Sequence, residues 1–154
     1  MKPKSEKAAK YPSEFIGPHD VQLERWISCS PFEKLLGIEI HEAQNGHSLL
    51  TMPFVRQLAQ GAGLAHGGAM VTLADTAVAM AVKSLVPPGS RFGTISLTSE
   101  FLAPVTRGIL TAKADVSLLE ERLIQGNCRV RDEEDREVLT FTSLFKLARD
   151  VKLL

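Results

Sequence analysis

The stretch from Gln60 to Met80, QGAGLAHGGAMVTLADTAVAM, decides the fold. It predicts a long helix from about Ala69 to Leu85, and Pro87-Pro88-Gly89 ends that helix. The helix is apolar on nearly every side, and a helix without a clear polar face is a buried one. Its many alanines are small, so a sheet can wrap closely around it.

Residues that alternate between apolar and polar with period two predict strands on both sides of this helix. Before it, Ile38–His41 and Ser48–Met52 flank Asn45-Gly46, which is the strongest short signal for a hairpin. After it, four further strands are expected at about 94–101, 110–118, 122–131 and 139–147. Connections this short imply antiparallel pairing. The fold class is therefore α+β, one antiparallel sheet of five or six strands curled around one central helix.

The length of 154 residues suits a single domain with a real core. Residues 1–20 are rich in lysine and proline and are expected to form a flexible N-terminal tail. Residues 21–154 form the domain, and within it Val21–Cys29 is expected to be a short helix.

Composition excludes several classes of function. Lys plus Arg number 18 and so do Asp plus Glu, and this zero net charge argues against binding nucleic acid or an anionic membrane. The longest apolar stretch, Ala69–Val82, is too short to span a bilayer, and the N-terminus lacks the apolar core of a signal peptide. We therefore expect a cytoplasmic protein.

The sequence contains few signals for a metal or a cofactor. The histidines have no metal-ligand spacing with Asp or Glu, and no glycine-rich phosphate loop is present. Cys29 and Cys128 lie far apart and are expected to be small, half-buried hydrophobic residues rather than a disulfide. Neither a metal nor a cofactor is expected.

Gly67-Gly68 opens the long helix. Glycine there lets a substrate approach the free N–H groups of the first turn. Those groups, with the helix dipole behind them, suit a carbonyl oxygen that acquires negative charge. The alternative is that the pair only makes a tight turn from loop to helix.

Asp75 lies in the middle of the same helix, among apolar residues. A buried carboxylate costs several kcal/mol unless it is paired or protonated, and burial raises its pKa. A raised pKa suits a general base or a nucleophile. The alternative is a structural aspartate that is hydrogen-bonded to a strand hydroxyl or to nearby backbone.

The spacing of Gly67 and Asp75 along the helix predicts a homo-oligomer. Asp75 follows Gly67 by eight residues, or roughly 12 Å along one helix, which is too far for both to touch one carbonyl. Two antiparallel helices related by a two-fold axis could bring Gly67 of one copy to Asp75 of the other. We therefore expect a homodimer with shared sites, and the pairing of dimers into a homotetramer is left open.

The motif HGGAMVTLADTAVAMA resembles that of the hotdog-fold thioesterases of the phenylacetate-degradation (PaaI-like) type. The segments PFEKLLGIEI, MPF and EFLAP extend the resemblance over residues 30–148. It implies hydrolysis of an acyl-CoA thioester, with an aryl or medium-chain acyl group. It also implies that Asp75 is the acidic residue of the catalytic site and that the Gly67 N–H is the oxyanion donor.

The resemblance implies roles for further residues. His66 orients the loop, with Gly68 beside it, and both are expected to contact substrate. Gln60 stands where the family often has Asn, and it keeps the amide with one more methylene. Thr94 matches a hydroxyl that assists the attacking water, and Ser96 is a substitute expected on the same strand face.

Two other classes of function compete with a thioester hydrolase. One is a non-catalytic acyl-CoA sensor on the same fold, and the other is a structural oligomerisation domain in which Asp75 only packs and bonds. Thiol release from a panel of acyl-CoAs, and its loss in Asp75→Asn, separates the three.

Overall fold

The structure is a computed structural model that describes residue 12 and residues 15–154, so most of the predicted tail over residues 1–20 lies outside the described residues. Its elements, in chain order, are α1 (Pro31–Leu35), β1 (Glu39–Gln44), β2 (His47–Pro53), a short 3-10 helix (Arg56–Leu58), α2 (Gly67–Lys83), β3 (Phe92–Phe101), β4 (Ile109–Glu120), β5 (Leu123–Arg131) and β6 (Glu137–Leu147).

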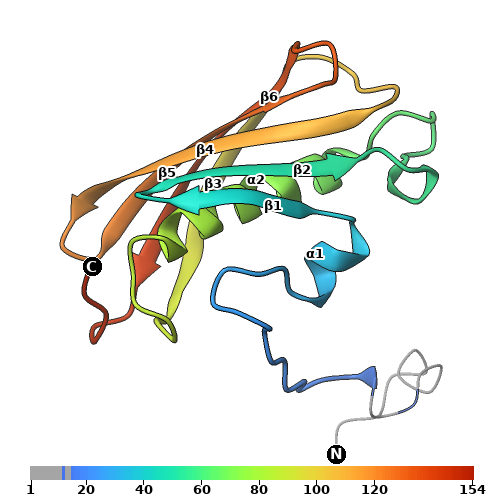
Figure 1. Cartoon of the computed structure of the whole chain (residues 1–154). Helices are drawn as coiled ribbons and strands as arrows, with labels where there is room; N and C mark the ends of the chain where they lie inside the picture. Colours follow the sequence, from blue (N-terminus) through green and yellow to red (C-terminus); the bar gives the residue numbers. More distant parts are fainter. Residues whose placement is uncertain (1–11, 13–14) are drawn as a thin grey trace, which may run out of the picture.

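The six strands form one sheet in the order β1-β2-β4-β5-β6-β3, and every neighbouring pair is antiparallel. Helix α2 lies along one face of this sheet, which curves around it (Figure 1). The predicted α+β architecture, with one long central helix, is confirmed. The two edges of the sheet differ in length, because β1 has six residues and β3 has ten.

The first hairpin has the turn that its sequence predicts. Asn45 and Gly46 join β1 to β2 with φ angles of 50° and 78°. Two successive residues with positive φ are typical of a type I′ turn, whose twist matches that of the flanking strands. The Asn-Gly pair therefore fixes the register of this edge of the sheet.

Small residues let α2 lie close against the sheet. A Cβ added to Gly126 of β5 would lie 2.1 Å from Cγ1 of Val78, so only glycine fits there. The Ser48 hydroxyl of β2 donates a 2.6 Å hydrogen bond to the carbonyl of Ala77 in the helix. The helix is thus attached to the sheet by close packing and by a buried polar contact.

The segment before α1 contradicts one prediction, because Val21–Cys29 contains bends at residues 24–28 and no helix. Tertiary contacts of Trp26 compete with the helical pattern. Its indole Nε1 donates to the carbonyl of Lys83 at 3.1 Å, and the Lys83 ammonium donates back to the Trp26 carbonyl at 2.9 Å. The segment therefore crosses the C-terminal end of α2 as a bent strap.

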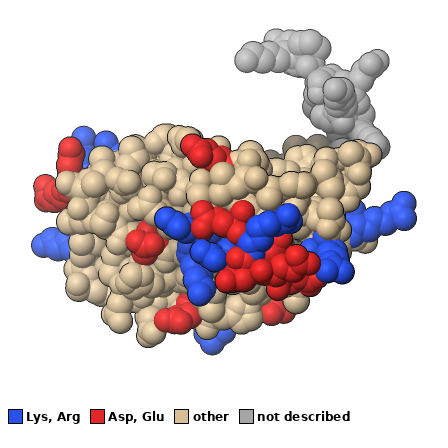
Figure 2. Space-filling model, turned by 90° about the horizontal axis from the view of Figure 1, so that it is seen from above, with Lys and Arg blue, Asp and Glu red and all other residues tan. Residues whose placement is uncertain are grey.

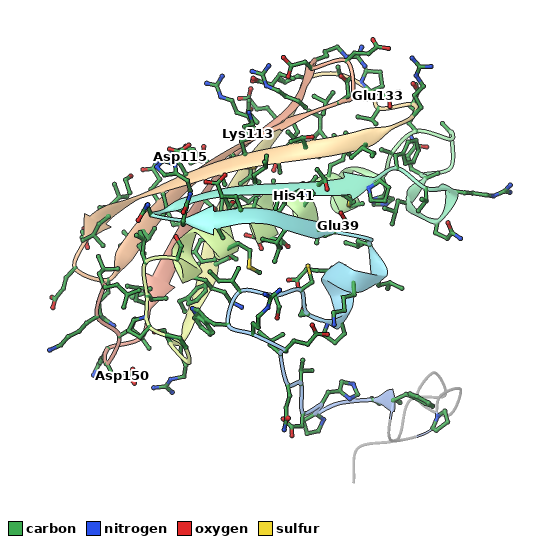
Figure 3. The ribbon with its side chains drawn as sticks, in the orientation of Figure 1. Glu39, His41, Lys113, Asp115, Glu133 and Asp150 are labelled. Carbon is green, nitrogen blue, oxygen red and sulfur yellow. The ribbon has the colours of Figure 1, made fainter. Side chains whose placement is uncertain are left out.

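The outer face of the sheet is polar. Charged side chains of both signs gather there around a shallow groove (Figure 2). Lys113 and Asp115 of β4 line this groove, on the face of the strand opposite α2 (Figure 3). The sheet therefore has an apolar face for the helix and a face of mixed charge for solvent.

Candidate active site

The N-terminus of α2 is capped by a histidine. His66 is the N-cap residue, and its Nδ1 accepts a 2.9 Å hydrogen bond from the N–H of Gly68. Within the described part of the chain, the N–H of Gly67 has no acceptor. One backbone donor at the positive end of the helix dipole thus remains available to an oxyanion.

Phe101, at the end of β3, packs against Gly67. A Cβ on Gly67 would lie 3.0 Å from Cε1 of this ring, so a larger residue would require the ring to move. Both residues line a cavity of about 310 Å³ at the start of α2. The sequence motif contained Phe101 without indicating this contact, because only the sheet register brings the ring to the helix.

Gln60 lines the same cavity as Gly67. Its side-chain oxygen accepts a hydrogen bond from the N–H of Ala62, and its backbone N–H donates to the carbonyl of Leu64 at 2.8 Å. These contacts hold the loop before the helix in a tight turn. Within the described residues, the side-chain amide nitrogen of Gln60 donates no hydrogen bond.

Asp75 is held by a strand hydroxyl. The hydroxyl of Thr94 in β3 donates a 2.9 Å hydrogen bond to Oδ1 of Asp75. Burial raises the pKa of the Asp75 carboxyl above its ordinary value, and the hydrogen bond from Thr94 offsets part of that rise. The structure therefore brings together these two predicted site residues within one chain.

Gly67 and Asp75 are not brought together within one chain. Both belong to α2, and a helical rise of 1.5 Å over eight residues separates them by roughly 12 Å. One copy of the chain thus presents an oxyanion donor and a carboxylate at two separate places.

Ser96 does not share the face of Thr94, which corrects the prediction. Thr94 pairs with Phe145 of β6 and Ser96 pairs with Leu144, so Ile95 is an extra residue in β3. Such a bulge changes the alternation of side chains along the strand. Thr94 therefore points towards α2 with the buried Phe145, and Ser96 points to the outer face.

Neither a metal centre nor a membrane span is found among the described residues. No three His, Cys, Asp or Glu side chains in residues 12 and 15–154 are placed to hold a metal ion. No described helix is long and apolar enough to cross a membrane.

Comparison with known proteins identifies the family. The model of the thioesterase superfamily matches residues 62–139. A putative esterase of Halobacterium salinarum is 32% identical over 126 residues, which cover 75% of this chain and 83% of that protein. The acyl-coenzyme A thioesterase PaaI of Escherichia coli is 38% identical over 84 residues, or 54% of this chain and 58% of that protein.

The fold agrees with this match. The solved structure of the Escherichia coli PaaI protein, from the phenylacetic acid degradation operon, superposes with a TM-score of 0.69 at 26% identity, over 76% of this chain and 83% of that one. The sheet and its central helix thus define a hotdog-fold thioester hydrolase. The chain belongs to the thioesterase superfamily and is PaaI-like, as its sequence predicts.

Proposed function

We propose that this protein hydrolyses acyl-CoA thioesters that carry an aryl or medium-chain acyl group. The carrying observation is a half-exposed carboxylate, Asp75, which a strand hydroxyl holds in place on an otherwise buried helix. The relationship to an acyl-coenzyme A thioesterase supports the substrate class.

A homodimer supplies the complete site. Strand β3 is an edge of the sheet, and its Ile95, Leu97 and Phe101 are 57%, 45% and 57% exposed. A long edge strand with apolar side chains is a template for pairing with another chain. Antiparallel pairing of two β3 strands about a two-fold axis sets the α2 helices side by side. Asp75 then faces Gly67 of the partner subunit.

In this dimer, the thioester carbonyl accepts a hydrogen bond from the Gly67 N–H of the partner subunit. Asp75 takes a proton from a water molecule, and the oxygen of that water attacks the carbonyl carbon. The tetrahedral oxyanion collapses and expels the CoA thiolate, which receives the proton that Asp75 had taken. The acid and free CoA are the products.

The hydrogen bond of Thr94 favours water attack over direct attack by the carboxylate. Because its hydroxyl proton is donated to Oδ1 of Asp75, the lone pairs of the Thr94 oxygen can accept from the attacking water. That water can give its other proton to Oδ2. Single-turnover hydrolysis in ¹⁸O-labelled water should leave Asp75 unlabelled, and label in Asp75 would show an anhydride intermediate instead.

The binding-module and structural alternatives also account for a hydrogen-bonded aspartate. They do not require a carboxylate that is half-exposed, with a raised pKa, or an oxyanion donor left without an acceptor in the described chain. These two features together favour catalysis.

The test measures thiol release from a panel of aryl- and alkyl-CoA thioesters. Asp75→Asn should lower kcat/KM by about 10²- to 10⁴-fold, the usual contribution of a general base, and should remain folded. Asp115→Asn makes the same change on the outer face of β4 and should leave kcat/KM unaltered. Near wild-type turnover in Asp75→Asn would overturn the assignment, and binding of acyl-CoA without turnover in the wild type would favour the sensor.

A further inference from the structure

Arg56 is a cation without a partner. It begins the short 3-10 helix, and its side chain is exposed. Within the described part of the chain, its guanidinium takes part in no hydrogen bond and no ion pair. Arg91 is equally exposed but is paired with Asp150 at 3.2 Å. The donors of Arg56 are therefore available to an anion from outside the chain.

The surroundings of Arg56 suit such an anion. Arg56 lines a groove of about 530 Å³ together with Phe54, Val55, Ala59, Gln60, Gly61 and Gly63. No carboxylate lines this groove, whereas the groove on the outer face of the sheet has more carboxylates than cations in its lining. A Cβ on Gly61 or Gly63 would meet nothing within 4 Å, so the loop leaves room there. The groove thus combines space with uncompensated positive charge.

This groove lies next to the cavity at the start of α2, because Gln60 lines both. The N–H of His66 donates to the carbonyl of Leu58 at 2.8 Å, so the segment between the 3-10 helix and α2 folds back on itself. From this contact and the spacing of consecutive Cα atoms, the backbones of Arg56 and Gly67 lie within roughly 15 Å of each other.

The charge of the groove selects one arm of the substrate. In the proposed site, the thioester carbonyl accepts from the Gly67 N–H, with the acyl group on one side and the CoA arm on the other. Only the CoA arm carries phosphates. About thirteen bonds separate its sulfur from the first phosphorus, which is roughly 15 Å in an extended chain. The diphosphate therefore comes within reach of the Arg56 guanidinium.

We propose that Arg56 binds the diphosphate of CoA in this groove. This inference rests on the proposed thioesterase function. The planar guanidinium donates two N–H groups to phosphate oxygens, the geometry for which arginine is suited. Between Gly67 and Arg56, the side-chain amide of Gln60 donates to an amide carbonyl of the pantetheine arm. The methylenes of that arm contact the apolar lining, which includes Met70 and Phe101.

The test compares three thioesters with the same acyl group, namely acyl-CoA, acyl-dephospho-CoA and acyl-pantetheine. Arg56→Gln should raise KM about three- to tenfold for the two substrates that contain the diphosphate, because it removes a charge-assisted contact at an exposed site. The value of kcat should not change, since the contact is equally strong in the ground state and in the transition state. The KM for acyl-pantetheine should also stay the same.

Arg91→Gln is the matched control, because it removes an exposed arginine that does not line the groove. It should keep the wild-type KM for all three substrates. An unchanged KM for acyl-CoA in Arg56→Gln would overturn the inference, and so would an equal rise for acyl-pantetheine. A rise for acyl-CoA but not for acyl-dephospho-CoA would assign Arg56 to the 3′-phosphate and would overturn its assignment to the diphosphate.

Binding of free CoA separates this inference from the function beneath it. Calorimetric titration with CoA should give a Kd about three- to tenfold higher for Arg56→Gln than for the wild type, and it requires no turnover. A wild type that cleaves none of the three thioesters would overturn the hydrolase function. Equal CoA affinity of the wild type and Arg56→Gln would overturn the role of Arg56 and leave the hydrolase function standing.

Discussion

On the side of α2 that faces the sheet, Val78 lies so close to β5 that Gly126 can carry no side chain. Towards the side of the helix that the sheet does not cover, Asp75 and Ala79 remain half-exposed. The same helix therefore presents one face on which each methyl group affects stability and another on which a polar group can be accommodated. Under the proposed function, stability and chemistry depend on different sides of one helix, so substitutions on the two sides should have different effects.

The sign of the pKa shift of Asp75 supports this division. Because its pKa in the folded protein is raised, the protonated form is favoured on folding. The stabilising contribution is complete below the ordinary pKa and is lost as the pH rises through the raised pKa. At neutral pH the ionised carboxylate costs stability, as expected of a residue retained for function.

The largest expected effect is a loss of thioester hydrolysis, which tests whether Asp75 and the Gly67 of the partner subunit share one site. Asp75→Asn and Gly67→Val should each be inactive as homodimers. When the two variants are unfolded together and refolded as a mixture, each heterodimer should hold one intact site, with Asp75 from one chain and Gly67 from the other. Statistical mixing should then restore about a quarter of the wild-type turnover.

This experiment measures thiol release before and after mixing. A mixture of wild type with Asp75→Asn is the control, and its turnover should follow the statistical share of intact sites. A mixture of the two variants that stays inactive, although heterodimers are detected by mass, would show that each site lies within one chain.

The next largest effect is a loss of stability, at the contact between α2 and the sheet. Gly126→Ala should lower the free energy of unfolding by about 1–3 kcal/mol, because its Cβ would lie 2.1 Å from Val78 Cγ1. Val78→Ala in the same chain makes room for that methyl group, so the double variant should be less destabilised than the sum of the two single variants. Denaturant unfolding at one protein concentration measures all three.

Gly61→Ala is the control for this cycle, since a Cβ there would meet nothing within 4 Å. It should leave stability nearly unchanged. Strict additivity of Gly126→Ala and Val78→Ala would contradict the close contact between helix and sheet.

The smallest effect is a shift in the pH dependence of kcat/KM. The hydrogen bond from Thr94 lowers the pKa of Asp75, so Thr94→Val should raise that pKa. The acidic limb of the kcat/KM profile, where Asp75 must lose its proton, should then move to higher pH. Thr94→Ser keeps the hydroxyl and should keep the wild-type limb. A limb that does not move in Thr94→Val would mean that another group governs it.

The architecture could be predicted because it depends on local patterns. The alternation along β4 to β6, the Asn45-Gly46 turn and the apolar helix are each visible within a short window of sequence. The strap was predicted wrongly at Val21–Cys29, because its conformation is set by Lys83, which is distant in the sequence. The pattern of residues within one short segment contains no information about such long-range contacts.

The candidate site was predictable in its residue types but not in all of its geometry. The spacing of Gly67 and Asp75 was sufficient to infer a second subunit, and this inference stays a prediction. The face of Ser96 was predicted wrongly, because a strand with an extra residue at Ile95 cannot be recognised from alternation alone. The contact of Phe101 with Gly67 likewise depends on pairing between β3 and β6.

The extra residue at Ile95 divides β3 into two halves of opposite phase. Before it, even-numbered residues such as Phe92 and Thr94 face the helix, and beyond it odd-numbered residues such as Phe101 do so. A slip of one position along β6 would misplace both halves at once, so the strand has one workable alignment. The inserted residue thus lets a single strand direct both the Thr94 hydroxyl to Asp75 and the Phe101 ring to Gly67, although seven positions separate the two side chains.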